Sequence, residues 1–183
     1  MTTTSPTDEL FSSSAVVHGS AQGFAQTITT GGHRLLADEP LSMGGMDTGP
    51  SPYDLLIAAL GACTSMTVSL YARRKQWPLE AVTVKITHRK VHAADCEECE
   101  KKSGLLDRIE RGIELHGALT EEQRSRLLEI ANKCPVHKTL TSQVQIVTEL
   151  VQLGARELAL ARWENEGGAV DPLPSATSKG PLR

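Results

Sequence analysis

The sequence predicts one domain built from a mixture of helices and antiparallel strands. Three observations lead to this prediction: short alternating segments separated by turns near the N-terminus, a long apolar helix with marked ends, and alternating segments before a second capped helix. A chain of 183 residues is long enough to bury one compact core. We expect a disordered tail at 1–13, the domain at 14–152, and a C-terminal extension at 153–183.

Three short segments open the domain, namely AVVHG (15–19), GFAQTIT (23–29) and HRLLAD (33–38). Each alternates in part between apolar and polar residues, and two consecutive glycines before the third segment suit a hairpin turn. We therefore expect an antiparallel meander. The stretch 39–52 that follows is rich in glycine and proline and lacks the Lys-Ser/Thr ending of a phosphate-binding loop, so we expect a plain connector.

A long helix is predicted from Pro52 to the basic residues 73–75. Ser51 is a natural N-cap, Pro52 suits the first helical position, and Asp54 places an acid in the first turn. Apolar residues cover most of the circumference, so the helix belongs in a core or at a subunit interface. One apolar stripe is formed by Leu56, Leu60, Cys63 and Leu70.

Two strands are expected next, at 81–91 and at 108–117. In the first of them, Val82, Val84 and Ile86 share one face. A capping-box pattern at 120–123 then opens a second helix.

This second helix places Leu127, Ala131 and Cys134 on one stripe and is halted by Pro135. The segment 143–151 (QVQIVTELV) predicts a last strand, and 155–164 (ARELALARWE) predicts a terminal helix before a mobile tail.

Composition argues against several classes of partner. The net charge is -3 with no basic stripe, so we expect no nucleic-acid binding. The N-terminal residues lack a basic leader and an apolar segment, which favours a cytoplasmic protein that does not bind membranes. In that reducing compartment the four cysteines are expected to be free, reactive or metal-binding.

Cys63 and Cys134 each have two interpretations from residue chemistry alone. Cys63, in the middle of an apolar helix and far from its N-terminus, reads either as an inert buried residue or as a nucleophile activated from elsewhere in the fold. For Cys134, a preceding helix end disfavours the thiolate and a following helical turn favours it. His137 and Lys138 could supply charge or a proton, or could belong to a solvated turn.

Cys96 and Cys99 have the spacing of half a zinc site, with His88 and His92 upstream. The alternative is an acidic, exposed loop between strands. A single C-x2-C pair is a weak candidate for a metal site, and we expect no metal and no organic cofactor.

Two cysteine motifs in this order resemble those of the OsmC/Ohr family, the osmotically inducible and organic hydroperoxide resistance proteins. The resemblance covers about residues 14–152 and rests on GG at 44–45, SPYDLLIAALGACTSM at 51–66 and CPVHKTL at 134–140. It implies an α+β fold with two long central helices and two antiparallel sheets. It also implies an intertwined homodimer with active sites at the subunit interface.

The family reduces hydroperoxides, often organic ones, in oxidative stress defence. By motif, Cys63 corresponds to the peroxidatic cysteine and Cys134 to the resolving cysteine. The resemblance therefore implies a thiol-dependent peroxidase without a cofactor, with a hydroperoxide as substrate and an external dithiol as reductant.

The chain departs from the family pattern at the charges that activate the thiol. Well-studied members carry a glutamate ten residues before the first cysteine, where this chain has Tyr53 beside Asp54. Their partner arginine from the early strands is also absent from AQGFAQ (21–26), and Arg34 has no matching role. Tyr53, Asp54 or His137 could support the thiol instead. The alternative function is a non-enzymatic thiol-binding or small-molecule-binding protein that has lost this Glu/Arg pair.

Overall fold

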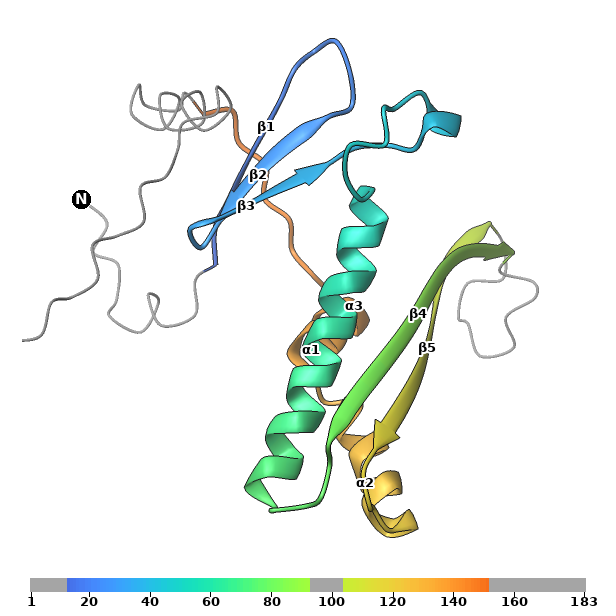
Figure 1. The fold of residues 1–183 in the computed structure, drawn as a ribbon. Coiled ribbons are helices and arrows are strands. Elements are labelled where there is room, and N and C mark those ends of the chain that lie inside the picture. The colour runs from blue at the N-terminus through green and yellow to red at the C-terminus, as the bar shows by residue number, and fades with distance from the viewer. Residues whose placement is uncertain (1–12, 93–103, 152–183) are drawn as a thin grey trace, which may run out of the picture.

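The computed structural model describes residues 13–92 and 104–151. Figure 1 shows two antiparallel sheets and three helices, with the three-stranded sheet near the N-terminal end of the longest helix and α2 near its C-terminal end. The α+β class is therefore confirmed. The elements are β1 (Ala15–Gly19), β2 (Gln26–Thr30), β3 (His33–Ala37), η2 (Leu41–Met43), α1 (Pro52–Arg74), β4 (Ala81–His92), β5 (Leu105–His116), α2 (Glu121–Ala131) and α3 (Pro135–Thr141).

The first sheet is the expected meander, in the order β1-β2-β3. Both pairs are antiparallel, and Ile28 of β2 lies opposite Val17 and Leu35. The turn between β2 and β3 needs its two glycines because Gly31 and Gly32 have φ of 54° and 79°, in the left-handed region that other residues avoid.

The loop after β3 is more than a connector, because the carboxylate of Asp38 organises it. Asp38 is buried and accepts hydrogen bonds from the backbone N–H of Met46 and from both the N–H and the hydroxyl of Thr48. Gly44 ends η2 with φ of 89°, and a Cβ on Gly45 would lie 1.8 Å from the Glu39 carbonyl oxygen. This double glycine is therefore required by the backbone of the loop.

Helix α1 has the predicted ends. Ser51 accepts a hydrogen bond from the Asp54 N–H, and the Asp54 carboxylate accepts in return from the Ser51 N–H, which completes a capping box with Pro52 at the first helical position. Helix α1 is long and apolar enough to cross a membrane. The core helix of a globular domain can meet the same criterion of length and composition.

The buried stripe of α1 differs from the predicted one. Leu60 is buried as expected, but Leu56 and Leu70 are 37% and 43% exposed, and Cys63 is half-buried. Apolar residues surround most of this helix, so the sequence could not show which side the rest of the chain covers. The residues of α1 that are buried are Leu60, Thr64, Val68 and Ala72.

The core lies between α1, α2 and the β4-β5 hairpin. Val68 and Ala72 of α1 pack with Leu127 and Ala131 of α2. The β4-β5 pair is antiparallel, as expected, with Val84 opposite Ile113. Partly buried apolar side chains surround this cluster: Tyr71, Trp77, Leu79, Val82, Ile113, Leu115 and Leu119.

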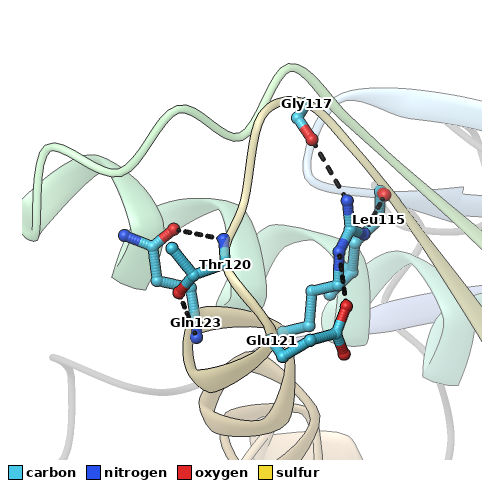
Figure 2. Close-up of polar contacts among 6 residues, drawn as sticks. Leu115, Gly117, Thr120, Glu121 and Gln123 are labelled. Atoms are coloured by element: carbon cyan, nitrogen blue, oxygen red, sulfur yellow. Dashed lines mark hydrogen bonds and ion pairs between the residues drawn. The ribbon is translucent and has the colours of Figure 1, made fainter.

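Helix α2 begins at the predicted capping box, which Figure 2 shows as reciprocal hydrogen bonds between Thr120 and Gln123. Arg124 fixes the preceding turn by donating to the carbonyl oxygens of Leu115 and Gly117 at 2.7 and 3.1 Å. Because Arg124 occupies carbonyls at the end of β5, it attaches α2 directly to the hairpin.

The second helix ends before Pro135, as predicted, but a further short helix that was not predicted follows it. Helix α2 ends at Ala131, and α3 starts at Pro135. Proline disfavours helical backbone at the residue before it, and Cys134 is extended with φ of -63° and ψ of 140°. Proline at the first position also starts a new helix. Pro135 therefore ends one helix and begins another.

The prediction of a last strand at 143–151 is wrong: in the structure of the single chain these residues form no strand. These residues belong to neither sheet, and all of them are exposed. The apolar residues that suggested a strand, Val144 and Ile146 among them, are 58% and 83% exposed. A strand must pair with the edge of another strand, and within the described residues this segment pairs with neither sheet. The tail at 1–12, the segment with Cys96 and Cys99, and the helix at 155–164 lie outside the described residues.

Replacing Leu127 by alanine is expected to lower the free energy of unfolding by about 2–5 kcal/mol, because the side chain is 1% exposed and its removal leaves a cavity against α1. Urea denaturation followed by circular dichroism measures this loss. Its neighbour Leu128 is 56% exposed, so Leu128→Ala should change the same quantity by about 0.5 kcal/mol or less. Equal losses in the two variants would contradict the packing described.

Candidate functional site

Cys134 sits at the break between α2 and α3 and is fully buried. Its sulfur acts as the N-cap of α3 and accepts a hydrogen bond from the backbone N–H of His137 at 3.3 Å. The sequence left open whether Cys134 belongs to the end of one helix or the start of the next. The structure places its side chain at the start of α3, where a backbone donor points at the sulfur.

Cys63 lies near the middle of α1, on the part of the helix that faces α3. Its side chain is half-buried and lies near the thiol of Cys134, whose pKa it lowers. Its backbone carbonyl also accepts a hydrogen bond from the Thr67 hydroxyl at 2.7 Å. The fold therefore brings together the two cysteines of the separate motifs.

Thr64 and Arg111 complete the polar surroundings of Cys134. The hydroxyl of Thr64 is buried and lies 3.7 Å from the Cys134 sulfur. Arg111 of β5 donates to this hydroxyl at 2.8 Å, to the Ala131 carbonyl at 3.3 Å and to the Asn132 side chain at 2.7 Å. A guanidinium thus reaches the thiol pair from the hairpin, with one hydroxyl between them.

The pKa of the Cys134 thiol is lowered from its ordinary value by this arrangement. Burial raises the pKa, but hydrogen bonds from the His137 N–H, Thr64 and Cys63, together with the charge of Arg111, outweigh burial. These groups stabilise a thiolate, which is the reactive form of cysteine.

Of the three residues expected to support the thiol, only His137 touches it, and it does so through its backbone. Tyr53 stacks on His88 with ring centroids 4.4 Å apart. Because α1 rises about 1.5 Å per residue, Tyr53 lies roughly 15 Å along the helix from Cys63. Asp54 serves the capping box, and hydrogen bonds from the hydroxyl and then the backbone N–H of Ser51 lower its pKa.

Arg34 does not extend this site. Arg34 lies on β3 and lines a hollow of about 300 Å³ on the three-stranded sheet, with Gln26 and Leu36 among its neighbours. Within 13–92 and 104–151, no group of three or more His, Cys, Asp or Glu side chains could hold a metal ion. Cys96 and Cys99 themselves fall outside these ranges.

A separate, mostly apolar groove of about 470 Å³ runs between α1 and β4. Neither cysteine lines it, although Ala62 and Ser65 of the same helical turns do. The lining residues are Asp54, Ile57, Ala58, Gly61, Ala62, Ser65, Val84 and Ile86.

Arg111 and Thr64 are the site residues that sequence reasoning missed. One signal was available, because strand β5 alternates and Arg111 occupies a position in line with Ile109, Ile113 and Leu115, on the face that packs inward. A charged residue in an apolar register indicates a partner in the interior. Thr64 gave no such signal beside the apolar residues of α1.

The model of the family described as OsmC-like protein matches residues 45–149 of this chain. The fold is similar to an organic hydroperoxide resistance protein OsmC from Legionella pneumophila, at 21% identity over 72% of this chain and 90% of that one, with a TM-score of 0.55. It is also similar to OhrB of Bacillus subtilis, at 20% identity over 72% of this chain and 92% of that one, with a TM-score of 0.51. A third similar structure is an OsmC-like protein of Mycoplasma pneumoniae, at 21% identity over 73% of this chain and 88% of that one, with a TM-score of 0.53. At these identities the likeness establishes the fold. No curated protein matches the chain.

The difference in exposure between the two cysteines predicts different access for a bulky reagent. In the native protein, N-ethylmaleimide should modify Cys63 before Cys134, because Cys134 is 0% exposed and Cys63 is half-buried. Mass spectrometry of tryptic peptides over a time course measures both rates, and denaturant should make the two rates similar. Faster modification of Cys134 in the native state would contradict the described burial.

Proposed function

Because this chain belongs to the OsmC-like protein family, we propose that it is a thiol-dependent peroxidase that reduces organic hydroperoxides with Cys63 and Cys134. The proximity of these two residues, which come from motifs far apart in the sequence, is the observation that carries the proposal: Thr64, next to Cys63 on α1, has its hydroxyl 3.7 Å from the Cys134 sulfur. Two thiols that lie side by side can be converted into one disulfide without a large movement of the backbone.

The proposed reaction uses both thiols in turn. The Cys63 thiolate attacks the O–O bond of the hydroperoxide, so that an alcohol leaves and Cys63 becomes a sulfenic acid. Cys134 then attacks that sulfur, water leaves, and a disulfide forms. An external dithiol reduces the disulfide and returns the pair to its starting state. The unequal exposure of the cysteines supports this assignment, since the half-buried thiol can meet a substrate and the buried thiol can meet its neighbour.

The surroundings of the pair support an organic substrate. Helix α1 is apolar around most of its circumference, and Leu60 and Val68 are buried on either side of Thr64. Two of the solved structures described above carry organic hydroperoxide resistance in their names. An alkyl chain gains free energy when it leaves water for such surroundings, whereas hydrogen peroxide does not.

The apolar groove between α1 and β4 favours a second candidate function, the binding of a small apolar molecule without catalysis. Its volume of about 470 Å³ lies within the usual range for ligand sites. Peroxide consumption with a dithiol donor distinguishes the two candidates: equal slow consumption by wild type and Cys63→Ser would favour binding.

Treatment with one equivalent of cumene hydroperoxide should link Cys63 to Cys134. We expect loss of both thiols and a disulfide-linked peptide pair, measured by thiol titration and mass spectrometry in a Cys96→Ser/Cys99→Ser background that removes competing thiols. Cys63→Ser should abolish the reaction. Cys134→Ser should instead stop at the sulfenic acid, which a dimedone adduct detects. Consumption of hydrogen peroxide as fast as cumene hydroperoxide would count against an organic substrate.

We further propose that the protein acts as a homodimer. The first sheet exposes Val17, Leu35 and Leu36, which are 58%, 46% and 47% exposed, and the segment 143–151 exposes an apolar series without a strand partner. A second copy of the chain could cover both surfaces and supply a strand partner for this segment.

Sedimentation equilibrium should therefore give twice the chain mass of 19.7 kDa. Ile146→Asp should weaken the dimer, because it places a charge on a side chain that is 83% exposed in the single chain and that we expect to be covered by the partner. The adjacent Gln145→Asp is the matched control and should leave the dimer intact. A wild-type protein that sediments as one chain would contradict this proposal.

A further inference from the structure

We infer that Arg111 is a positioning residue for the thiol pair: through the Thr64 hydroxyl it stabilises a negative charge on Cys134. This inference rests on the proposed function and adds to it the cation that the family pattern led us to seek in the early strands.

Arg111 is half-buried and all its hydrogen-bond acceptors are neutral. It donates to a hydroxyl on Thr64, to the Ala131 carbonyl and to the amide of Asn132. Its neighbour Glu110 points to the other face of the strand and pairs with arginines there, at 2.7 and 3.0 Å. No carboxylate within 13–92 and 104–151 forms an ion pair with Arg111. A partly desolvated cation without a counterion favours an anion nearby.

The hydroxyl of Thr64 can transmit the stabilising effect of this positive charge to the Cys134 sulfur. Its oxygen accepts from Arg111 at 2.8 Å, so its single proton remains to be donated. Two acceptors compete for that proton, the Leu60 carbonyl at 2.8 Å and the Cys134 sulfur at 3.7 Å. When Cys134 ionises, the proton can turn toward the sulfur. Arg111 strengthens this donation because it withdraws electron density from the hydroxyl oxygen.

The groups that face Cys134 from each neighbouring element all favour this charge. Helix α1 contributes Cys63 and Thr64, strand β5 contributes Arg111, and α3 contributes the backbone N–H of His137. Lys133, which precedes Cys134, is exposed. Together these groups lower the pKa of Cys134 although burial raises it.

This charge distribution gives each thiol a proton-transfer role in the proposed reaction. The Cys134 thiolate takes the proton of Cys63, and the Cys63 sulfur then attacks the peroxide, so that the O–O bond breaks and an S–O bond forms. The departing alkoxide takes the proton from Cys134 and leaves as the alcohol. Cys134, again a thiolate, attacks the Cys63 sulfenic acid; the S–S bond forms, and hydroxide leaves and is protonated by solvent to water. Two electrons pass from the thiols to the peroxide, which is reduced.

The test is the ionisation of Cys134, which needs no peroxide. Thiolate absorbance at 240 nm is titrated against pH in a Cys63→Ser/Cys96→Ser/Cys99→Ser background, where Cys134 is the remaining cysteine. Arg111→Met should raise the midpoint by about one pH unit or more, a tenfold change in the ionisation constant. Arg111→Lys should restore part of the shift. Arg108→Met removes an exposed arginine of the same strand and is the matched control, expected to leave the midpoint unchanged.

A second pair of variants tests the hydroxyl and replaces the first if Arg111→Met does not fold. Thr64→Val keeps the shape but removes the hydroxyl and should raise the midpoint, whereas Thr64→Ser keeps the hydroxyl and should not. An unchanged midpoint in both Arg111→Met and Thr64→Val would overturn the inference, even if the wild type reduces peroxides. A raised midpoint together with a failure to form the disulfide would retain the role of Arg111 and reject the peroxidase.

Discussion

The constraint on which the site depends is the proline that follows Cys134. Pro135 cannot continue α2 and forces the residue before it into extended backbone, so Cys134 leaves the helix instead of lying along its surface. Its sulfur then takes the place of a capping oxygen for α3. A cysteine within a continuous helix would have its N–H engaged by the helix and would face no free backbone donor. The backbone break thus creates the polar environment in which this thiol becomes acidic.

The packing of α1 makes the other half of the site. Its buried stripe is apolar except for Thr64, which lies between Leu60 and Val68 in the same stripe. A buried hydroxyl is costly unless it is hydrogen-bonded, and Thr64 meets this requirement through the Leu60 carbonyl and Arg111. The one polar position of this stripe is also the one that lies against the Cys134 sulfur. The contacts that satisfy the buried Thr64 hydroxyl therefore also place it against the reactive sulfur of Cys134.

Features decided by local chemistry could be predicted from the sequence. The N-cap at Ser51 and the capping box at Thr120 depend on residues close in sequence, and the meander depends on alternation and a glycine turn, so each is confirmed as expected. The boundaries of the β4-β5 hairpin were predicted less accurately, because β5 begins at Leu105 and the pattern indicated a start at residue 108.

Features that depend on contacts between distant segments could not be predicted in the same way. An apolar helix such as α1 has several stripes of similar hydrophobicity, and only the position of Leu127 and Ala131 selects the one that is buried. Arg111 could be recognised as unusual within an apolar register, but its acceptors come from α1 and from the end of α2. The segment 143–151 has the alternation of a strand, yet pairing also requires an edge, which alternation does not reveal.

Because α1 is apolar around most of its circumference, much of its apolar surface remains exposed in the single chain. Of the 23 residues of α1, four are buried, while Met66 and Leu70 are 70% and 43% exposed. Burying a side chain of this size contributes about 1.5–3 kcal/mol, so a helix with this composition gains most from a second covered face. The sheet at its N-terminal end and the segment 143–151 carry exposed apolar residues as well. One partner that covers all three surfaces would bury the exposed apolar residues of α1, as the homodimer proposed above would.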